Sequence, residues 1–188
     1  MKLVTKNVFW KLMLTSCLVI PCEMSAQEEK VFEFDSYKDI MQLFDNLGYT
    51  EATWDAGERG VYRAYLQNMP SRWRGEYSQE IEVKMKKEVF LRALAPLVLR
   101  SNELILEDRT QVLSLVKSGK TDDAWLKALA QRYRVLESLE DDLTENNISE
   151  LISRVDAIPN SLALAQTIEE SGWGTSRFAD QGNAMFGG

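Results

Sequence analysis

The residues with the clearest chemical potential stand near the end of the chain, where a glutamate precedes a glycine-rich turn. Glu170 lies four residues after Gln166 and seven after Ala163, so these three share one face of a predicted helix. The last turn of a helix carries partial negative charge, which disfavours a carboxylate. The burial that we expect beside Trp173 also disfavours the charged form of Glu170, and so does the negative charge of the neighbouring Glu169. A glutamate kept neutral in this way suits general acid catalysis.

The turn after this glutamate contains two glycines that flank Trp173 and leave room for a substrate beside the backbone. Gly172 suits a left-handed helix cap, and Thr175 is expected to cap a second short helix. The spacing alone is also typical of a plain corner between two helices, with Trp173 in the core and Glu170 on the surface.

Histidine is absent from the 188 residues, and the two cysteines, Cys17 and Cys22, stand near the N-terminus. A Ser-His-Asp or Cys-His catalytic arrangement, a histidine-ligated metal and a C-x-x-C motif are therefore excluded. Carboxylates, hydroxyls, amides and aromatic rings must supply the chemistry, and neither a metal nor another cofactor is expected.

Residues 1–26 have the pattern of a secretory signal peptide. A basic segment ending at Lys11 precedes an apolar stretch, Leu12–Cys22, which is shorter than the roughly 20 residues of a membrane span. Cleavage is expected after Ala26. Leu14–Cys17 resembles a bacterial lipoprotein box, so lipidation ranks second, and the structural alternative is an ordinary buried helix. Membrane contact is expected only through this segment.

Removing that segment would leave 19 basic and 28 acidic residues, and so a net charge of −9. A chain this acidic repels phosphate backbones, so no nucleic-acid partner is expected. Export and charge together favour a protein of the periplasm or cell envelope that acts on an uncharged polymer.

The rest of the chain is mainly helical by its periodicity, with apolar residues three and four apart. Predicted helices open at Phe34–Ser36, near Ser78, at Thr121–Asp123, at Thr144 and around Pro159.

Some of these stretches carry a more specific expectation. Pro96 lies within the helical stretch 78–119, which predicts a kink or two consecutive helices there. The helix after Asp123 is expected to reach Leu139. Val61–Leu66 fits either a helix or a short strand. Near the C-terminus an apolar stripe is expected from Leu162, Leu164, Ala165 and Ile168.

Two segments near the C-terminus together carry a resemblance to a known family. The stretch Ser161–Phe178 contains Ala-Gln-x-x-x-Glu-Ser-Gly-Trp-Gly, and Asn183–Gly187 follows it as Asn-x-x-Phe-Gly. Together they resemble the opening of a glucosaminidase domain, a peptidoglycan hydrolase module of the lysozyme superfamily, in particular that of the Bax-like family of exported bacterial proteins. Phe90–Glu103 is similar to the helical region that precedes the domain in that family.

The resemblance implies that Glu170 protonates the glycosidic oxygen of an N-acetylglucosamine linkage in peptidoglycan glycan strands. Glu169 stands where the family usually has a small or apolar residue, but the register with Ser-Gly-Trp-Gly favours Glu170. The substrate-binding residues implied in the same way are Gln166, Ser171, Trp173, Asn183 and Phe186.

The resulting expectation has three parts: a signal peptide (1–26), a helical N-terminal region (27–155) and the truncated start of a glucosaminidase domain (156–188). The fold class is all-α in the part present, with the first helices of a lysozyme-like α+β domain whose β-rich lobe is missing. A second catalytic group is needed in such hydrolases unless the substrate's acetamido group serves. Asp180 is the only acid after Glu170, and its context does not mark it as that group, so this chain is expected to be inactive alone.

Two other functions fit the same residues. A lytic transglycosylase also uses one glutamate, and a helical cell-envelope protein could bind polymer or partners without catalysis. Tyr65, Trp73 and Trp125 could stack on sugar rings, although core positions are the simpler explanation.

Overall fold

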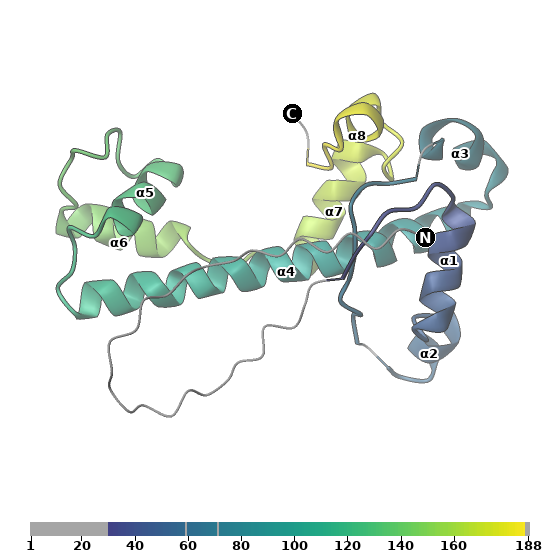
Figure 1. The fold of residues 1–188 in the computed structure, drawn as a ribbon, viewed down its shortest axis with the longest axis horizontal. Coiled ribbons are helices and arrows are strands. Elements are labelled where there is room, and N and C mark those ends of the chain that lie inside the picture. The colour runs from purple at the N-terminus through teal and green to yellow at the C-terminus, as the bar shows by residue number, and fades with distance from the viewer. Residues whose placement is uncertain (1–29, 59, 71, 187–188) are drawn as a thin grey trace. The chain divides into compact units, whose positions relative to one another are not determined.

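The computed structural model describes residues 30–58, 60–70 and 72–186, so the predicted signal segment lies outside the described residues. The described part is mostly helical (Figure 1) and contains a two-stranded parallel sheet. It divides into two compact units: one holds the described residues up to Pro96 and from Thr167 onwards, the other Leu97–Gln166. The division therefore falls at Pro96 and Gln166, and the domain boundary expected after residue 155 stays a prediction.

The first unit begins with strand β1 (Lys30–Phe32) and helix α1 (Tyr37–Asn46), followed by α2 (Glu51–Asp55) and β2 (Ala64–Leu66). As predicted, a helix opens after Ser36, whose side chain accepts a hydrogen bond from the Lys38 amide. β2 is buried and pairs in parallel with β1, Lys30 opposite Ala64. The strand alternative for this stretch is therefore the correct one.

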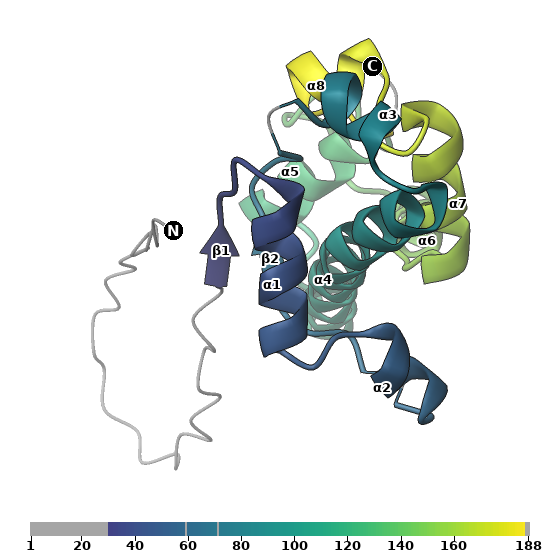
Figure 2. The same ribbon diagram turned by 90° about the vertical axis from the view of Figure 1, so that its right-hand side faces the viewer.

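The remainder of the first unit surrounds the predicted site. It contains a π-helical turn, η1 (Trp73–Tyr77), the short α3 (Ser78–Glu80) and the start of α4 (Val83–Lys117). The end of α7 (Asn160–Ser171) and α8 (Arg177–Gly182) complete it. α8 packs against η1 and lies near α3 (Figure 2).

Helix α4 runs without interruption through Pro96, so the expectation of two consecutive helices was wrong. Pro96 has no amide hydrogen to donate to the preceding turn, but the hydrogen bonds on either side continue the helix. Among the described residues, no helix combines the length and apolar character needed to cross a membrane.

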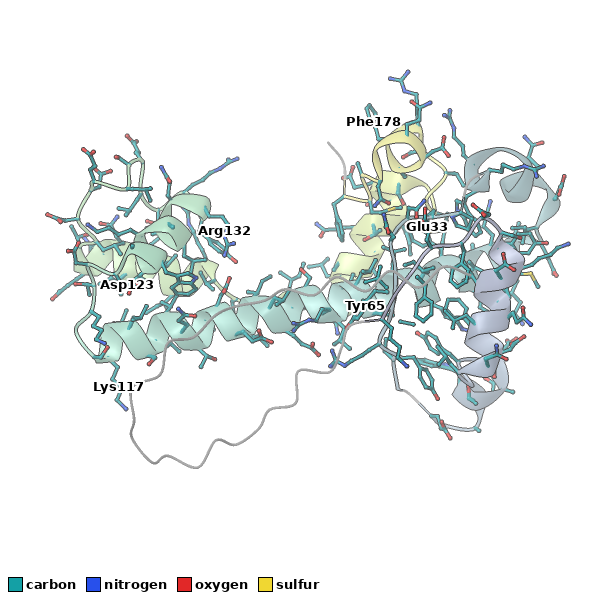
Figure 3. The ribbon with its side chains drawn as sticks, in the orientation of Figure 1. Glu33, Tyr65, Lys117, Asp123, Arg132 and Phe178 are labelled. Atoms are coloured by element: carbon teal, nitrogen blue, oxygen red, sulfur yellow. The ribbon has the colours of Figure 1, made fainter. Side chains whose placement is uncertain are left out.

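The second unit contains α5 (Ala124–Arg132) and α6 (Glu145–Arg154), which pack on the end of α4. Asp123 caps α5 as predicted, and Asp123 and Arg132 mark its two ends (Figure 3). The helix does not reach Leu139, which is exposed. Thr144 caps α6 in a reciprocal pair with Asn147. The core residues of this unit are Val112, Leu126, Leu129, Ala130, Leu136, Leu151 and Val155.

Helix α7 buries small side chains rather than the predicted apolar stripe. Ala163, Thr167 and Ser171, at a spacing of four, are at most 3% exposed, whereas Leu162 is 50% exposed. The stripe was wrong because small residues allow the closest approach of a helix, and a buried hydroxyl is tolerated when it is hydrogen-bonded. This buried face decides where the predicted site residues point.

Candidate active site

Glu170 lies in the last turn of α7 and is exposed, as are Glu169 and Gln166. The expected burial of Glu170 was therefore wrong. The residues that α7 buries, Thr167 and Ser171, place Glu170 on the flank of the packed face, where its carboxyl group reaches the surface. A carboxyl group in this position is open to a large substrate.

The backbone turns sharply immediately after this helix. Gly172, Trp173 and Gly174 have φ angles of 56°, 63° and 74°, so three consecutive residues are left-handed. The predicted cap at Gly172 is confirmed. Trp173 is the unusual member, because a bulky side chain rarely adopts positive φ and must be held there by its surroundings.

Side chains of the motif itself close the turn. The Ser171 hydroxyl donates to the Thr167 carbonyl (2.5 Å) and accepts from the Gly174 amide (2.9 Å). Thr175 donates to the carbonyl of Gly172 (2.6 Å). Ser171 has no exposed surface to offer a substrate, so its part in the motif is to hold the turn.

Helix α8 begins differently from the prediction. Its cap is Ser176, whose side chain accepts from the Ala179 amide, whereas Thr175 is bonded within the preceding turn. Phe178 projects outward from α8 and is 62% exposed (Figure 3). Asp180 is exposed on the same helix.

Residues far upstream hold Trp173. The indole Nε1 of Trp73 donates to the Trp173 carbonyl oxygen at 2.9 Å. Phe90 meets the Trp173 ring edge-on, with centroids 5.7 Å apart, and the Lys87 ammonium lies 5.2 Å from the ring centroid. Trp173 is half-buried, so part of its ring still faces solvent.

The far end of the motif has a similar upstream contact. Asn183 ends α8 in a left-handed conformation, and its side-chain amide donates to the Gln67 carbonyl at 3.1 Å. Phe186, three residues later, is 55% exposed. Of the predicted substrate-binding residues, Gln166, Asn183 and Phe186 are exposed and Trp173 half-exposed, whereas Ser171 is internal.

The upstream partners were missed from the sequence. Trp73 is 1% exposed, which agrees with the core position preferred over sugar stacking, but nothing near it in the sequence indicates a partner 100 residues away. Its neighbours Gln67, Lys87 and Phe90 were not considered part of the site.

No cluster of three or more potential metal-ligating side chains occurs among the residues that the structure describes. Hollows among the described residues of the first unit include one beside α1, between Phe34 and Leu43, and one beside α2, between Tyr49 and Tyr62. Neither includes a motif residue, and the candidate site is an exposed carboxyl group beside a firmly held turn.

Comparison with known proteins gives one informative likeness. No protein-family model matches the chain, and no solved structure matches it significantly. Protein bax of Escherichia coli (strain K12) is 35% identical over 105 residues, which make up 54% of this chain and 38% of protein bax. The chain thus spans less than half the length of that relative, and the likeness supports a Bax-like family for the matched part.

Proposed function

We propose that this protein is a peptidoglycan hydrolase that cleaves N-acetylglucosamine glycosidic bonds with Glu170 as the general acid. The observation that carries the proposal is the exposed carboxyl group of Glu170, which only Ser171 separates from a turn of three left-handed residues. A general acid must be reachable by the substrate, and the held turn gives the backbone beside Glu170 a defined position. The motif resemblance and the likeness to protein bax support the assignment.

The reaction begins with transfer of the Glu170 proton to the glycosidic oxygen as the bond to the sugar breaks. Half-exposed Trp173 and exposed Phe186, which precede and follow α8 in the sequence, offer aromatic surfaces for the sugar rings. The substrate's own acetamido group can serve as the second group, attacking the sugar carbon as the bond breaks, and water then completes the hydrolysis.

Peptidoglycan lies outside the cytoplasm, so the proposed activity requires export. The signal peptide proposed at residues 1–26 would provide it. Cell fractionation and determination of the mature N-terminus would test this step, since retention of the protein in the cytoplasm contradicts it.

The experiment that tests the function compares two adjacent carboxyl groups. Glu170→Gln and Glu169→Gln remove one charge each from exposed side chains on the same helical turn. Assayed on purified sacculi in the full-length encoded protein, Glu170→Gln should lower the cleavage rate by about 10²–10⁴-fold, the usual contribution of a general acid. Glu169→Gln should cleave close to the wild-type rate.

The products separate the enzymatic alternatives. Mass spectrometry of the digest should show reducing N-acetylglucosamine ends, whereas anhydro-sugar ends would indicate a lytic transglycosylase. Glu170→Gln protein that cleaves as fast as wild type would overturn the assignment of the acid. A wild-type protein that binds sacculi without cleaving them would favour the non-catalytic envelope protein.

A further inference from the structure

We propose that Trp73 is a positioning residue for Glu170, an inference that rests on the function proposed above. Trp73 opens η1 and is 1% exposed. Its indole Nε1 donates to the carbonyl oxygen of Trp173 at 2.9 Å, three residues after the proposed acid. A residue of the upstream helical region thereby binds the backbone of the motif.

This hydrogen bond acts on the part of the turn that most needs support. Trp173 is held at a φ of 63° between two left-handed glycines. The hydrogen bonds of Ser171 and Thr175 fix the two sides of the turn, and Trp73 fixes its central carbonyl group. Without an outside donor, the peptide after Trp173 would be free to rotate toward a conformation that suits a bulky side chain better.

The turn also packs closely on the same upstream residues. A Cβ atom added to Gly174 would lie 3.2 Å from the Trp73 Nε1 and 3.2 Å from the nearest Phe90 ring atom. The backbone at Gly174 therefore rests directly on Trp73 and Phe90, and a glycine is required there. Packing and hydrogen bonding together make Trp73 a fixed support for residues 173–174.

Movement of this turn is transmitted to Glu170 through Ser171. The Ser171 hydroxyl bonds both to the Gly174 amide and to the Thr167 carbonyl, so the last turn of α7 and the left-handed turn shift together. Catalytic groups tolerate displacements of only about 0.5 Å. Loss of the Trp73 support should therefore slow the chemical step, and it should weaken binding to a smaller extent because Trp173 also belongs to the proposed binding surface.

The test measures kcat and KM on soluble glycan fragments in the full-length encoded protein. Trp73→Phe, which keeps an aromatic ring and removes the donor, should lower kcat by about tenfold or more and change KM by a clearly smaller factor. Gly174→Ala, which disturbs the same contact from the other side, should act alike. Phe44→Leu is the control. Phe44 is also buried in this unit, at 2% exposure, and its ring packs against Tyr49.

A double variant separates positioning from general damage. Because Trp73 acts through Glu170, adding Trp73→Phe to Glu170→Gln should lower the residual rate no further. The positioning role would be overturned if Phe44→Leu lost as much kcat as Trp73→Phe at the same thermal stability. A double variant slower than Glu170→Gln alone would overturn it as well. If Glu170→Gln alone keeps wild-type activity, the proposed function fails instead.

Should Trp73→Phe fail to fold, replacing Trp73 with 3-benzothienylalanine keeps the shape of the indole and exchanges only the N–H for sulfur. The same fall in kcat is expected, and an unchanged kcat would overturn the proposal.

Discussion

The side-chain amide of Asn183 donates a hydrogen bond of 3.1 Å to the carbonyl oxygen of Gln67, 116 residues earlier in the chain. Asn183 is the asparagine of the Asn-x-x-Phe-Gly segment and ends α8 at a φ of 51°. Gln67 directly follows β2. One residue therefore terminates a helix of the motif and attaches it to the upstream part of the same unit.

Two replacements of Asn183 should separate its conformation from its hydrogen bond. Asn183→Gly keeps access to the left-handed region and loses the bond, whose net value is about 0.5–1.5 kcal/mol. Asn183→Ala loses the bond and adds about 1–2 kcal/mol of backbone strain. In urea unfolding, the wild type should be the most stable, followed by Asn183→Gly and then by Asn183→Ala. Equal stability of the two variants would show that the left-handed cap imposes no strain.

Local signals in the sequence were sufficient to locate several helix starts. Ser36, Asp123 and Thr144 each accept a hydrogen bond from an amide in the first turn of the helix that follows. These bonds join residues two or three apart, so side-chain chemistry and position within a few residues determine them. The left-handed cap at Gly172 was predictable for the same reason.

The support of the candidate site could not be predicted in this way. The bond between Trp73 and the Trp173 carbonyl spans 100 residues and depends on how the chain folds back. The buried face of α7 was missed for a different reason. Hydrophobic periodicity ranks residues by type, whereas Thr167 and Ser171 are buried because they are small and Ser171 is hydrogen-bonded within its own helix.

A pair of glycine replacements should show that the Gly174 position is crowded as well as left-handed. Gly57 has a φ of 95° and nothing within 4 Å of an added Cβ, whereas a Cβ at Gly174 would meet Trp73 and Phe90 at 3.2 Å. Gly57→Ala should cost about 1–2 kcal/mol through backbone strain alone. Gly174→Ala should cost about 1–3 kcal/mol more through overpacking. Chemical denaturation measures both, and equal losses would argue against close packing at Gly174.

Removing the hydroxyl of Tyr65 should stabilise the protein. Tyr65 lies in β2 at 6% exposure (Figure 3), and its hydroxyl has no hydrogen-bond partner among the described residues. A buried unpaired hydroxyl costs about 1–3 kcal/mol, so Tyr65→Phe should raise the free energy of unfolding by about 1 kcal/mol. Tyr62→Phe, at a 38% exposed position, is the control and should change little. A loss of stability in Tyr65→Phe would mean that the hydroxyl is bonded in solution.

In the second unit, replacing the side-chain amide nitrogen of Asn102 should destabilise the protein. Its side-chain nitrogen donates to the Ile158 carbonyl (2.7 Å) and to Asn160 Oδ1 (2.6 Å). Asn102→Asp would set a carboxylate against these two oxygens and should destabilise the protein by about 1–3 kcal/mol at neutral pH. Part of the loss should return in acid, where the neutral carboxyl group can donate one bond. Unfolding at two pH values checks this, and a loss independent of pH would contradict it.

The ion pair between Lys84 and Glu51 allows a prediction about protonation. Their charged atoms are 2.7 Å apart, and the hydrogen bond and charge of Lys84 lower the pKa of Glu51. A lowered folded-state pKa means that the stabilisation is present above the unfolded-state pKa and is lost as the pH falls through the folded-state pKa. Lys84→Ala should therefore raise the pKa of Glu51 toward its ordinary value, as measured by carboxyl-carbon NMR titration.

High salt should raise the same pKa in the wild-type protein, because both side chains are exposed and screening weakens their attraction. For the same reason the free energy of unfolding should scarcely change in Lys84→Ala. An unchanged pKa of Glu51 in Lys84→Ala would show that the two side chains are not paired in solution.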